Sequence, residues 1–164
     1  MAAEIFLKLT DVTGESKGKG HEGEIDVYSY SLGASNPSSV STGGGSGAGK
    51  VDFSSLSIQK SADLATSKLL LTCAQGKHFD QGVLVVREAG GDTPVEYITI
   101  TMNQVFIDSV SWGASSGGGK PSESVSMSFA TIDIVYWSQD AKGSKDQKTE
   151  VGWDIKANTA TASA

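Results

Sequence analysis

Apolar and polar residues alternate along most of the chain, in short segments separated by clusters of glycine, serine, asparagine and aspartate. A period of two is typical of strands with one buried and one solvated face, and small polar clusters favour turns between them. The pattern therefore predicts a mainly all-β fold, a two-sheet β-barrel or sandwich. We expect its strands near Ile5–Thr10, Glu24–Gly33, Val51–Lys60, Gly82–Glu88, Val95–Met102, Val105–Trp112, Ser124–Trp137 and Val151–Lys156.

One segment follows a helical period instead. Within Ala65–Gln75 the residues Leu69, Leu70 and Cys73 stand at i, i+1 and i+4, and Gly76 follows at the position where helices commonly end. We expect one short α-helix here, packed against the sheet, with Cys73 on its inner face as a small buried apolar residue.

Two patterns indicate apolar surface on both sides of a strand. Val83–Val86 is apolar without interruption, which a sheet with one solvated side does not favour. Within Ser124–Trp137 the apolar set changes phase, and a slip of one residue moves side chains to the other face. The two sets are Val125, Met127 and Phe129, then Ile132, Ile134 and Tyr136. Both patterns favour a subunit with an apolar interface, although a core covered from both sides within one chain explains them nearly as well.

Composition limits the domain organisation and the partners. At 164 residues and 17.0 kDa the chain has the size of one domain, over 1–164, in which we expect 158–164 to be a flexible tail. Its 13 basic and 19 acidic residues give a net charge of −6. This is the wrong sign for a protein that neutralises phosphate groups, so neither nucleic acid nor an anionic membrane is an expected partner.

The apolar content and the cysteine content bear on the compartment. Glu4 and Lys8 lie inside the apolar run at the N-terminus, which therefore fits neither a signal peptide nor a membrane-inserted segment. Cys73 is the one cysteine, so no intramolecular disulfide is possible and a reducing compartment is favoured. We expect a protein made in the cytoplasm, which would leave the cell only by an unconventional route.

A glycine-rich segment resembles a phosphate-binding loop, because Gly44, Gly49 and Lys50 have the spacing of that motif. The motif also needs a Ser or Thr after the lysine for Mg²⁺ and a helix after the loop, whereas Val51 begins a strand pattern. No nucleotide or other cofactor is therefore expected. The glycine-rich segment is part of a long extended loop that the sequence predicts over Ala34–Lys50. Long loops in compact domains are usually functional.

Other candidate catalytic or metal-binding residues lack their partners. Ser115, within Gly113–Gly117, matches the G-x-S-x-G motif of hydrolases, but both histidines precede it in the chain. His21 stands beside Glu22 and Glu24 without a second histidine nearby, which favours a solvated acidic turn over a metal site. We expect neither an enzyme nor a metal protein.

Aromatic residues leave one other function open. Small β-sandwiches can bind carbohydrate on a cluster of exposed rings, but here the aromatic residues occur singly in strand patterns, where packing explains them. They are Trp112, Trp137, Trp153, Tyr28, Tyr30 and Tyr136. A small carbohydrate-binding module therefore stays open as an alternative hypothesis.

An ordered series of motifs is more specific than any of these. It consists of Gly14-Glu15-Ser16-Lys17, His21-x-x-Glu24-Ile25-Asp26-Val27, Gly43–Val51, Cys73-Ala74-Gln75-Gly76-Lys77-His78, Ala89-Gly90-Gly91-Asp92 with Val95-Glu96-Tyr97, and Val151-Gly152-Trp153-Asp154-Ile155. Together these motifs resemble the hemolysin-coregulated protein family, Hcp, of bacterial type VI secretion. The resemblance extends from about Ala2 to Asn158 and is less clear over Ser35–Thr42 and Ser138–Thr149.

The resemblance implies a structural protein whose homo-hexameric rings stack into the inner tube of a contractile secretion machine. Its partners would be other copies of the chain, the spike and sheath proteins of the machine, and small effector proteins held in the lumen of the ring. Such a subunit is cytoplasmic before assembly and is then secreted without a cleavable signal peptide.

Two groups of residues are expected to carry this function. Ser29 and Ser31 lie on the small, polar face of Glu24–Gly33, which suits a channel wall that must hold cargo and release it; filling of the barrel core is the other interpretation. The opposite face of that strand presents Tyr28, Tyr30 and Leu32. A loop that contacts the neighbouring ring would use Gly43, Gly44, Gly45, Gly47, Gly49 and Lys50.

Overall fold

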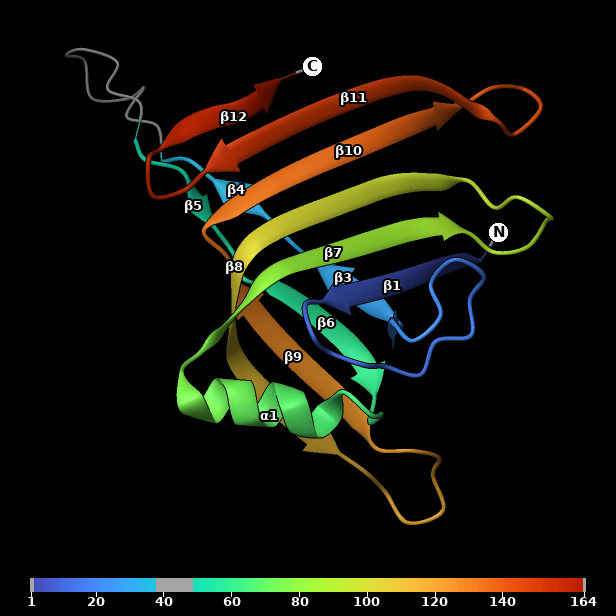
Figure 1. The fold of residues 1–164 in the computed structure, drawn as a ribbon, viewed down its shortest axis with the longest axis vertical. Helices are drawn as coiled ribbons and strands as arrows, with labels where there is room; N and C mark the ends of the chain where they lie inside the picture. The colour runs from blue at the N-terminus through green and yellow to red at the C-terminus, as the bar shows by residue number, and fades with distance from the viewer. Residues whose placement is uncertain (1, 38–48, 164) are drawn as a thin grey trace.

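The computed structural model describes residues 2–37 and 49–163 (Figure 1). Within them the fold is mainly β with one helix, as the alternation predicts. The strands are β1 (Ala3–Leu9), β2 (Ile25–Val27), β3 (Ser29–Ser31), β4 (Ala34–Ser35), β5 (Asp52–Phe53), β6 (Leu56–Ser61), β7 (His78–Glu88), β8 (Glu96–Gly113), β9 (Ser122–Ser128), β10 (Thr131–Gln139), β11 (Lys145–Asp154) and β12 (Thr159–Ser163), and the helix is α1 (Thr66–Gln75).

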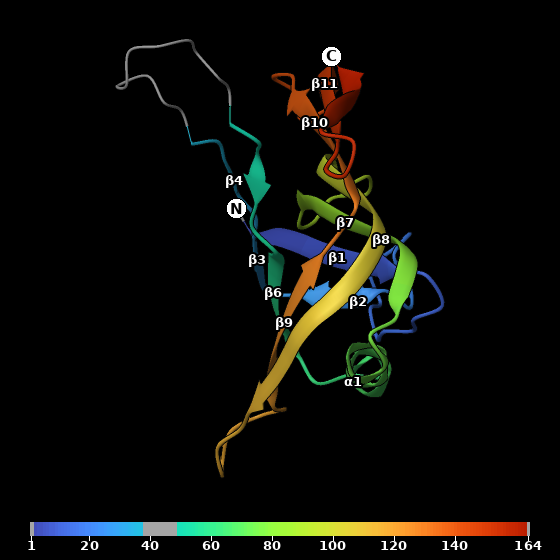
Figure 2. The same cartoon turned by 90° about the vertical axis from the view of Figure 1, so that its left-hand side faces the viewer.

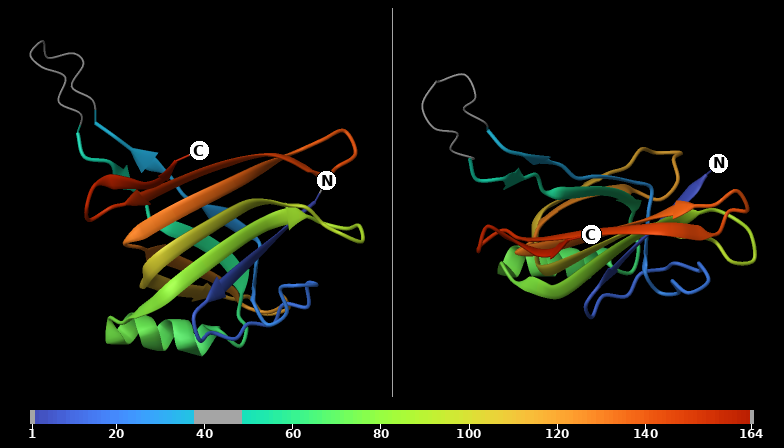
Figure 3. Two further views of the ribbon diagram at one scale, coloured as in Figure 1. Left: turned by 45° about the horizontal axis from the view of Figure 1, so that its top comes forward. Right: turned by 90° about the horizontal axis from the view of Figure 1, so that it is seen from above.

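A 10-stranded antiparallel sheet folds over itself into two layers (Figure 2). The first layer has the order β12-β11-β10-β8-β7-β1-β2, and β8 continues into the second layer, where β9, β6 and β3 follow. Because β12 and β2 end the first path, the described strands form an open sandwich and not a closed barrel. Strands β4 and β5 form a separate two-stranded ribbon that extends from the body (Figure 3).

Strand β8 joins the layers because its two halves have different partners. Residues 98–103 pair with β10, whereas residues 106–113 pair with β9. Between them Gln104 has a φ of 51°, a left-handed conformation that is uncommon outside glycine and that bends the strand. The expected strands Val95–Met102 and Val105–Trp112 are therefore one strand of 18 residues.

The phase slip within Ser124–Trp137 also arises where the chain passes from one layer to the other. This segment is two strands, β9 and β10, and the backbone N–H of Ala130 between them donates to the carbonyl of Asn103 (2.9 Å) at the bend of β8. Phe129 and Ile132, on either side of the slip, both lie in the core. The slip therefore marks the change of layer and does not expose an apolar interface.

Strand β7 is covered on both faces by its own chain. Leu84 belongs to the core between the layers, while Val85 on the other face is only 6% exposed. Phe6 of β1 lies opposite Val85, and the imidazole of His21 stacks on Phe6 with ring centres 4.4 Å apart. The segment that carries His21 covers this face, so the apolar run Val83–Val86 reflects burial within one chain.

The helix forms where the period predicts it, and Gly76 ends it with a φ of 63°. Leu69 and Thr72 are buried and Cys73 packs against the core. Leu70, expected on the inner face, is exposed, because the next residue along a helix points about 100° away from Leu69. Among the described residues no helix is long and apolar enough to cross a membrane.

A buried ionic network attaches α1 to the second layer. Lys60 of β6 donates to Asp63 at 2.8 Å and to Glu123 of β9 at 2.9 Å, and the side chains of Lys60 and Glu123 are fully buried. Thr66, in the first turn of α1, donates to the same Glu123 oxygen at 2.7 Å. A buried charge without its partner is unfavourable, so this network fixes the start of the helix on the strands.

The C-terminal hairpin is longer than the sequence pattern predicts. Strand β11 begins at Lys145, whereas the sequence pattern placed its start at Val151. The pattern missed residues 145–150 because they are polar on both faces, at a sheet edge that β12 does not reach. The end of the chain, 158–164, was expected to be flexible. In the structure it continues as strand β12 as far as Ser163, paired with β11.

Replacing Lys60 with Met should lower the free energy of unfolding by about 3–5 kcal/mol, because Glu123 is then buried without a cation. Urea denaturation at one protein concentration, followed by circular dichroism, measures this. Lys148→Met is the control: it removes an exposed ion pair with Glu150 and should change the same quantity by less than about 1 kcal/mol. Equal effects of the two substitutions would contradict the role given to the buried network.

Candidate functional site

One face of the second layer is covered with hydroxyl groups. Strands β3, β6, β9 and the second half of β8 turn their apolar side chains to the core, and their alternate positions face outward on the side away from α1 (Figure 2). The polar outward positions form the hydroxyl-rich face, and they are Ser29, Ser31, Ser57, Gln59, Ser61, Asp108, Ser109, Ser111, Ser122, Ser124, Ser126 and Ser128. One outward position is apolar, Phe106, which lies opposite Ser128 and is 39% exposed. Most members of the hydroxyl-rich face are small, so the face stays hydrated.

The strand register aligns these side chains in rows. Ser31 pairs with Ser57, Ser57 with Ser126, and Ser126 with Ser109. The hydroxyl oxygens of Ser57 and Ser126 are hydrogen-bonded at 3.2 Å. The next row consists of Ser29, Gln59, Ser124 and Ser111, and a hydrogen bond joins two of its members as well. Because neighbouring side chains in these rows are hydrogen-bonded to each other, the face is stable without a ligand. It can still form hydrogen bonds with one.

The structure places Ser29 and Ser31 at the surface. Both are exposed, while Tyr30 between them and Leu32 after them pack against the core, as the alternation predicts. The other interpretation, that the two serines fill the core, is therefore wrong. Tyr28 was expected on the same side as Tyr30 but is 68% exposed, and its hydroxyl is hydrogen-bonded to that of Ser61. Tyr28 lies between β2 and β3, where the chain changes partner strand and the alternation is interrupted.

The sequence motifs that imitate catalytic loops have a different structural context. Lys50 is exposed and is followed by strand β5, where a phosphate-binding loop requires a helix. Ser115 lies between β8 and β9, so it also precedes a strand. Gly49 is held close to Pro37, since an added Cβ would lie 2.7 Å from the Pro37 carbonyl oxygen. The other glycines expected to contact a neighbouring ring lie outside the described residues, namely Gly43, Gly44, Gly45 and Gly47.

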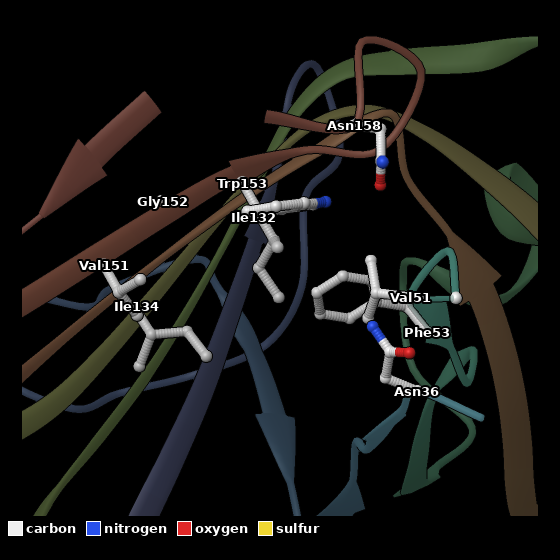
Figure 4. Close-up of a pocket in the computed structure, with 10 residues that line it drawn as sticks. Asn36, Val51, Phe53, Ile132, Ile134, Val151, Gly152, Trp153 and Asn158 are labelled. Atoms are coloured by element: carbon white, nitrogen blue, oxygen red, sulfur yellow. The ribbon is translucent and has the colours of Figure 1, made fainter. Parts of the chain in front are cut away.

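An apolar pocket of about 370 Å³ lies between the β4–β5 ribbon and the sheet of β10 and β11 (Figure 4). Val51 and Phe53 approach it from the ribbon, and Ile132, Val151 and Trp153 from the sheet. The indole N–H of Trp153 is buried and has no acceptor among the described residues, which is unfavourable by about 1–3 kcal/mol. The lining of the pocket is mostly apolar, so the pocket suits an apolar group.

His21 is buried and does not lie in the solvated turn expected for it. Its Nδ1 is 2.8 Å from a carboxylate oxygen of Glu24, and its Nε2 is 2.8 Å from one of Glu96. With both nitrogens engaged and the ring stacked on Phe6, His21 fixes the covering segment to the sheet. Sequence reasoning missed this contact because Glu96 is 75 positions away along the chain.

The aromatic residues considered for carbohydrate do not gather on one surface. Trp153 lines the apolar pocket and Tyr30 packs against the core. Trp112 is exposed near the end of β8, Tyr136 is exposed on β10, and Tyr28 lies at a corner of the hydroxyl-rich face. Tyr136 and Trp137 of β10 border one cavity together with Tyr97, and the other four candidates do not line it.

The sequence matches a family model described as "Type VI secretion system effector, Hcp" over residues 6–136. The chain belongs to the Hcp family of type VI secretion tube proteins. Protein hcp1 of Pseudomonas aeruginosa is 44% identical to it over 159 residues, which cover 96% of this chain and 98% of that protein. The resemblance drawn from the ordered motifs is thereby confirmed.

Solved structures of Hcp proteins share the fold. Hcp1 from Salmonella typhimurium is 33% identical, with a TM-score of 0.78, and the match covers 98% of this chain and 99% of that one. A structure described as that of a type six secretion system protein is 27% identical, with a TM-score of 0.91 and coverage of 98% and 100%. Hcp is a family of structural secretion proteins, and the hydroxyl-rich face is a feature of this Hcp chain that its strand register creates.

Replacing Ser126 with Gln should change the free energy of unfolding by less than about 0.5 kcal/mol, because the side chain points outward from the sheet. The matched control is Val125→Gln, one position away and only 1% exposed, which should lower it by about 3 kcal/mol or more because it buries an amide without partners. Denaturant titration of both variants measures the difference. A large loss in Ser126→Gln would show that the face is packed against another part of the chain.

Proposed function

We propose that this Hcp chain is the subunit of homo-hexameric rings that stack into the inner tube of the type VI secretion machine, with the hydroxyl-rich face toward the lumen. The observation that carries the proposal is this face itself, since Ser29 and Ser31 belong to rows of small polar side chains that cross the second layer. Small effector proteins held in the lumen would contact this wall before they are expelled.

The chemistry of the face supports a wall that holds cargo weakly. Hydrogen bonds exchanged with water are individually worth only about 0.5–1.5 kcal/mol, and hydroxyls that already satisfy one another gain still less from a ligand. A large apolar wall would bind cargo too tightly to release it. A ring multiplies weak contacts over its copies, so cargo is retained by their number and released when the tube comes apart.

Self-association is supported by apolar surface that remains uncovered. The pocket beside Trp153 is open, and Val151 at its edge is 53% exposed. Such a surface favours burial against another molecule, and a second copy of the chain is the partner that a tube provides. The run Val83–Val86 is covered within the chain and does not enter this argument.

Stacking of rings is assigned to the loop Ala34–Lys50, including Gly43, Gly44, Gly45, Gly47, Gly49 and Lys50. It begins with β4 and is followed by β5, and these two strands form the ribbon that extends away from the body (Figure 3). The spike and sheath proteins of the machine are the further partners. The subunit would be cytoplasmic until assembly and then secreted without a cleavable signal peptide.

A carbohydrate-binding module is the function of another class. Its candidate aromatic residues lie in several parts of the molecule, since Tyr136 and Trp137 border one cavity, Trp153 lines another and Tyr30 packs against the core. An enzyme is disfavoured because the residues after Lys50 and Ser115 form strands.

Light scattering of the purified chain at micromolar concentration tests the ring. We expect a particle about six times the 17.0 kDa mass of the chain, seen as rings by negative-stain electron microscopy. Apolar surface around the pocket would be buried in this particle. The substitution Val151→Asp should therefore shift the measured particle mass toward that of the monomer. A stable monomer of the unmodified chain would refute the tube proposal.

Replacing Ser31 with Gln should leave the rings intact but reduce the small effector proteins that co-purify with them, because the longer side chain fills the wall where cargo would lie. Mass spectrometry of purified rings from producing cells measures the ratio of cargo to subunit. Ser116→Gln, an exposed serine between β8 and β9, is the control and should leave that ratio unchanged. Wild-type cargo levels in Ser31→Gln would remove Ser31 from the proposed wall.

A further inference from the structure

Asp108 is the one formally charged member of the hydroxyl-rich face, all of whose residues the structure describes. The other charged residues of the same strand segments, Lys60 and Glu123, point inward and neutralise each other in the buried network. At the far corner of the face, beside Ser61, a small cavity is lined by charges of both signs from neighbouring elements. Asp108 is therefore an isolated negative charge on an otherwise neutral wall.

A β-bulge presents this carboxylate. In the pairing of β8 with β9, Ile107 is opposite Met127 and Ser109 is opposite Ser126, so Asp108 is an extra residue with no partner of its own. Bulges of this kind aim a side chain in a direction that regular alternation does not allow. Here the bulge leaves two consecutive residues, Asp108 and Ser109, on the outward side, and Asp108 is exposed.

Two hydroxyl groups hold the carboxylate in place. Ser55 donates to Oδ2 of Asp108 at 2.9 Å, and Ser128 donates to Oδ1 at 2.9 Å. Each carboxylate oxygen can accept about two hydrogen bonds, so one acceptor direction on each oxygen remains directed to solvent. A fixed anion with free acceptor sites is suited to an ammonium or guanidinium group.

We propose that Asp108 makes the hydroxyl-rich face selective for polypeptide segments that carry lysine or arginine. The inference rests on the proposed function in that such segments are the cargo of the lumen, whereas the charge preference itself is a property of each subunit. The serines contribute hydrogen bonds that any polypeptide can accept, and they do not discriminate among cargoes. The isolated carboxylate discriminates, because it attracts cations and repels anions over a distance of about one Debye length.

The occupant follows from charge complementarity and from the shape of the face. An extended or helical peptide surface with a cationic side chain can place that side chain on Asp108 while its polar groups lie along the serine rows. An acidic segment would bring two anions together, and an apolar segment would leave the hydroxyl groups without contact. A single exposed ion pair is weak, which agrees with a wall that must release its cargo.

A structural role confined to the bulge is the alternative explanation for Asp108, and one pair of variants separates the two. Asp108→Asn keeps an oxygen acceptor for one serine and removes the charge. Asp146→Asn makes the same change in net charge at an exposed residue of β11, outside the hydroxyl-rich face. Both purified full-length variants are compared with the wild-type chain.

The probes are three peptides, acetyl-Gly-Lys-Gly-Lys-Gly-amide and its versions with glutamine or glutamate in place of lysine. Dissociation constants are measured by NMR titration of the backbone amides, at about 50 mM and about 500 mM salt. We expect the lysine peptide to bind the wild type about threefold more tightly than the glutamine peptide at low salt, with the glutamate peptide weakest. This preference should disappear in Asp108→Asn and at high salt, and should persist in Asp146→Asn.

Equal loss of preference in the two variants would assign it to net charge and overturn the proposal, as would equal binding of the three peptides by the wild type. If Asp108→Asn does not fold, the side-chain carboxyl carbon of Asp108 in the wild type decides. The NMR chemical shift of this carbon should change when the lysine peptide is added and should not change when the glutamine peptide is added. The absence of that difference overturns the proposal.

Light scattering of the same samples separates this inference from the tube. A monomer that retains the lysine preference would refute the ring and leave the role of Asp108 standing. Rings that lack the lysine preference would support the tube and refute the role of Asp108.

Discussion

Strand β8 enters the first layer at Glu96 and leaves the second at Gly113, and the pairings on both sides of it depend on the bend at Gln104. A straight strand of this length would keep both halves in one sheet. The bend instead allows β9 to follow β8 in one layer and β10 to follow it in the other, with Ala130 hydrogen-bonded to Asn103 where they diverge. The core lies between the two layers that this one strand connects.

The two faces of the second layer have opposite chemistry because apolar and polar residues alternate along its strands, with one interruption at the bulge of Asp108. Inward positions are apolar except for Lys60 and Glu123, whose charges are paired in the interior and hold the start of α1. Outward positions are serine, glutamine, one aspartate and Phe106. The same pairing register that buries the ionic network aligns the serines in rows, so the anchoring of the helix and the polarity of the wall have one structural origin.

The first layer solves a different problem, since β7 has apolar residues on both faces. The core covers one face, and the segment carrying His21 covers the other through the stack on Phe6 and the carboxylates of Glu24 and Glu96. Arg87 adds to this cover, because it lies over the Phe6 ring and pairs with Glu4. Polar groups thus attach a loop to an apolar sheet surface, whereas the apolar pocket beside Trp153 is lined by residues of the ribbon and the sheet and stays open.

The sequence by itself determined the class of the fold, the helix with its end at Gly76, the outward direction of Ser29 and Ser31, and the Hcp family. These follow from local periodicity and from ordered motifs, both of which act over short stretches of chain. The tertiary structure alone decided the course of Ser124–Trp137, the burial of His21 and the position of Asp108. Each of these depends on a pairing between residues distant in sequence, as when the bulge at Asp108 exists only opposite Ser126. The periodicity of a strand indicates which of its residues share a face, but it does not indicate which other strand pairs with it.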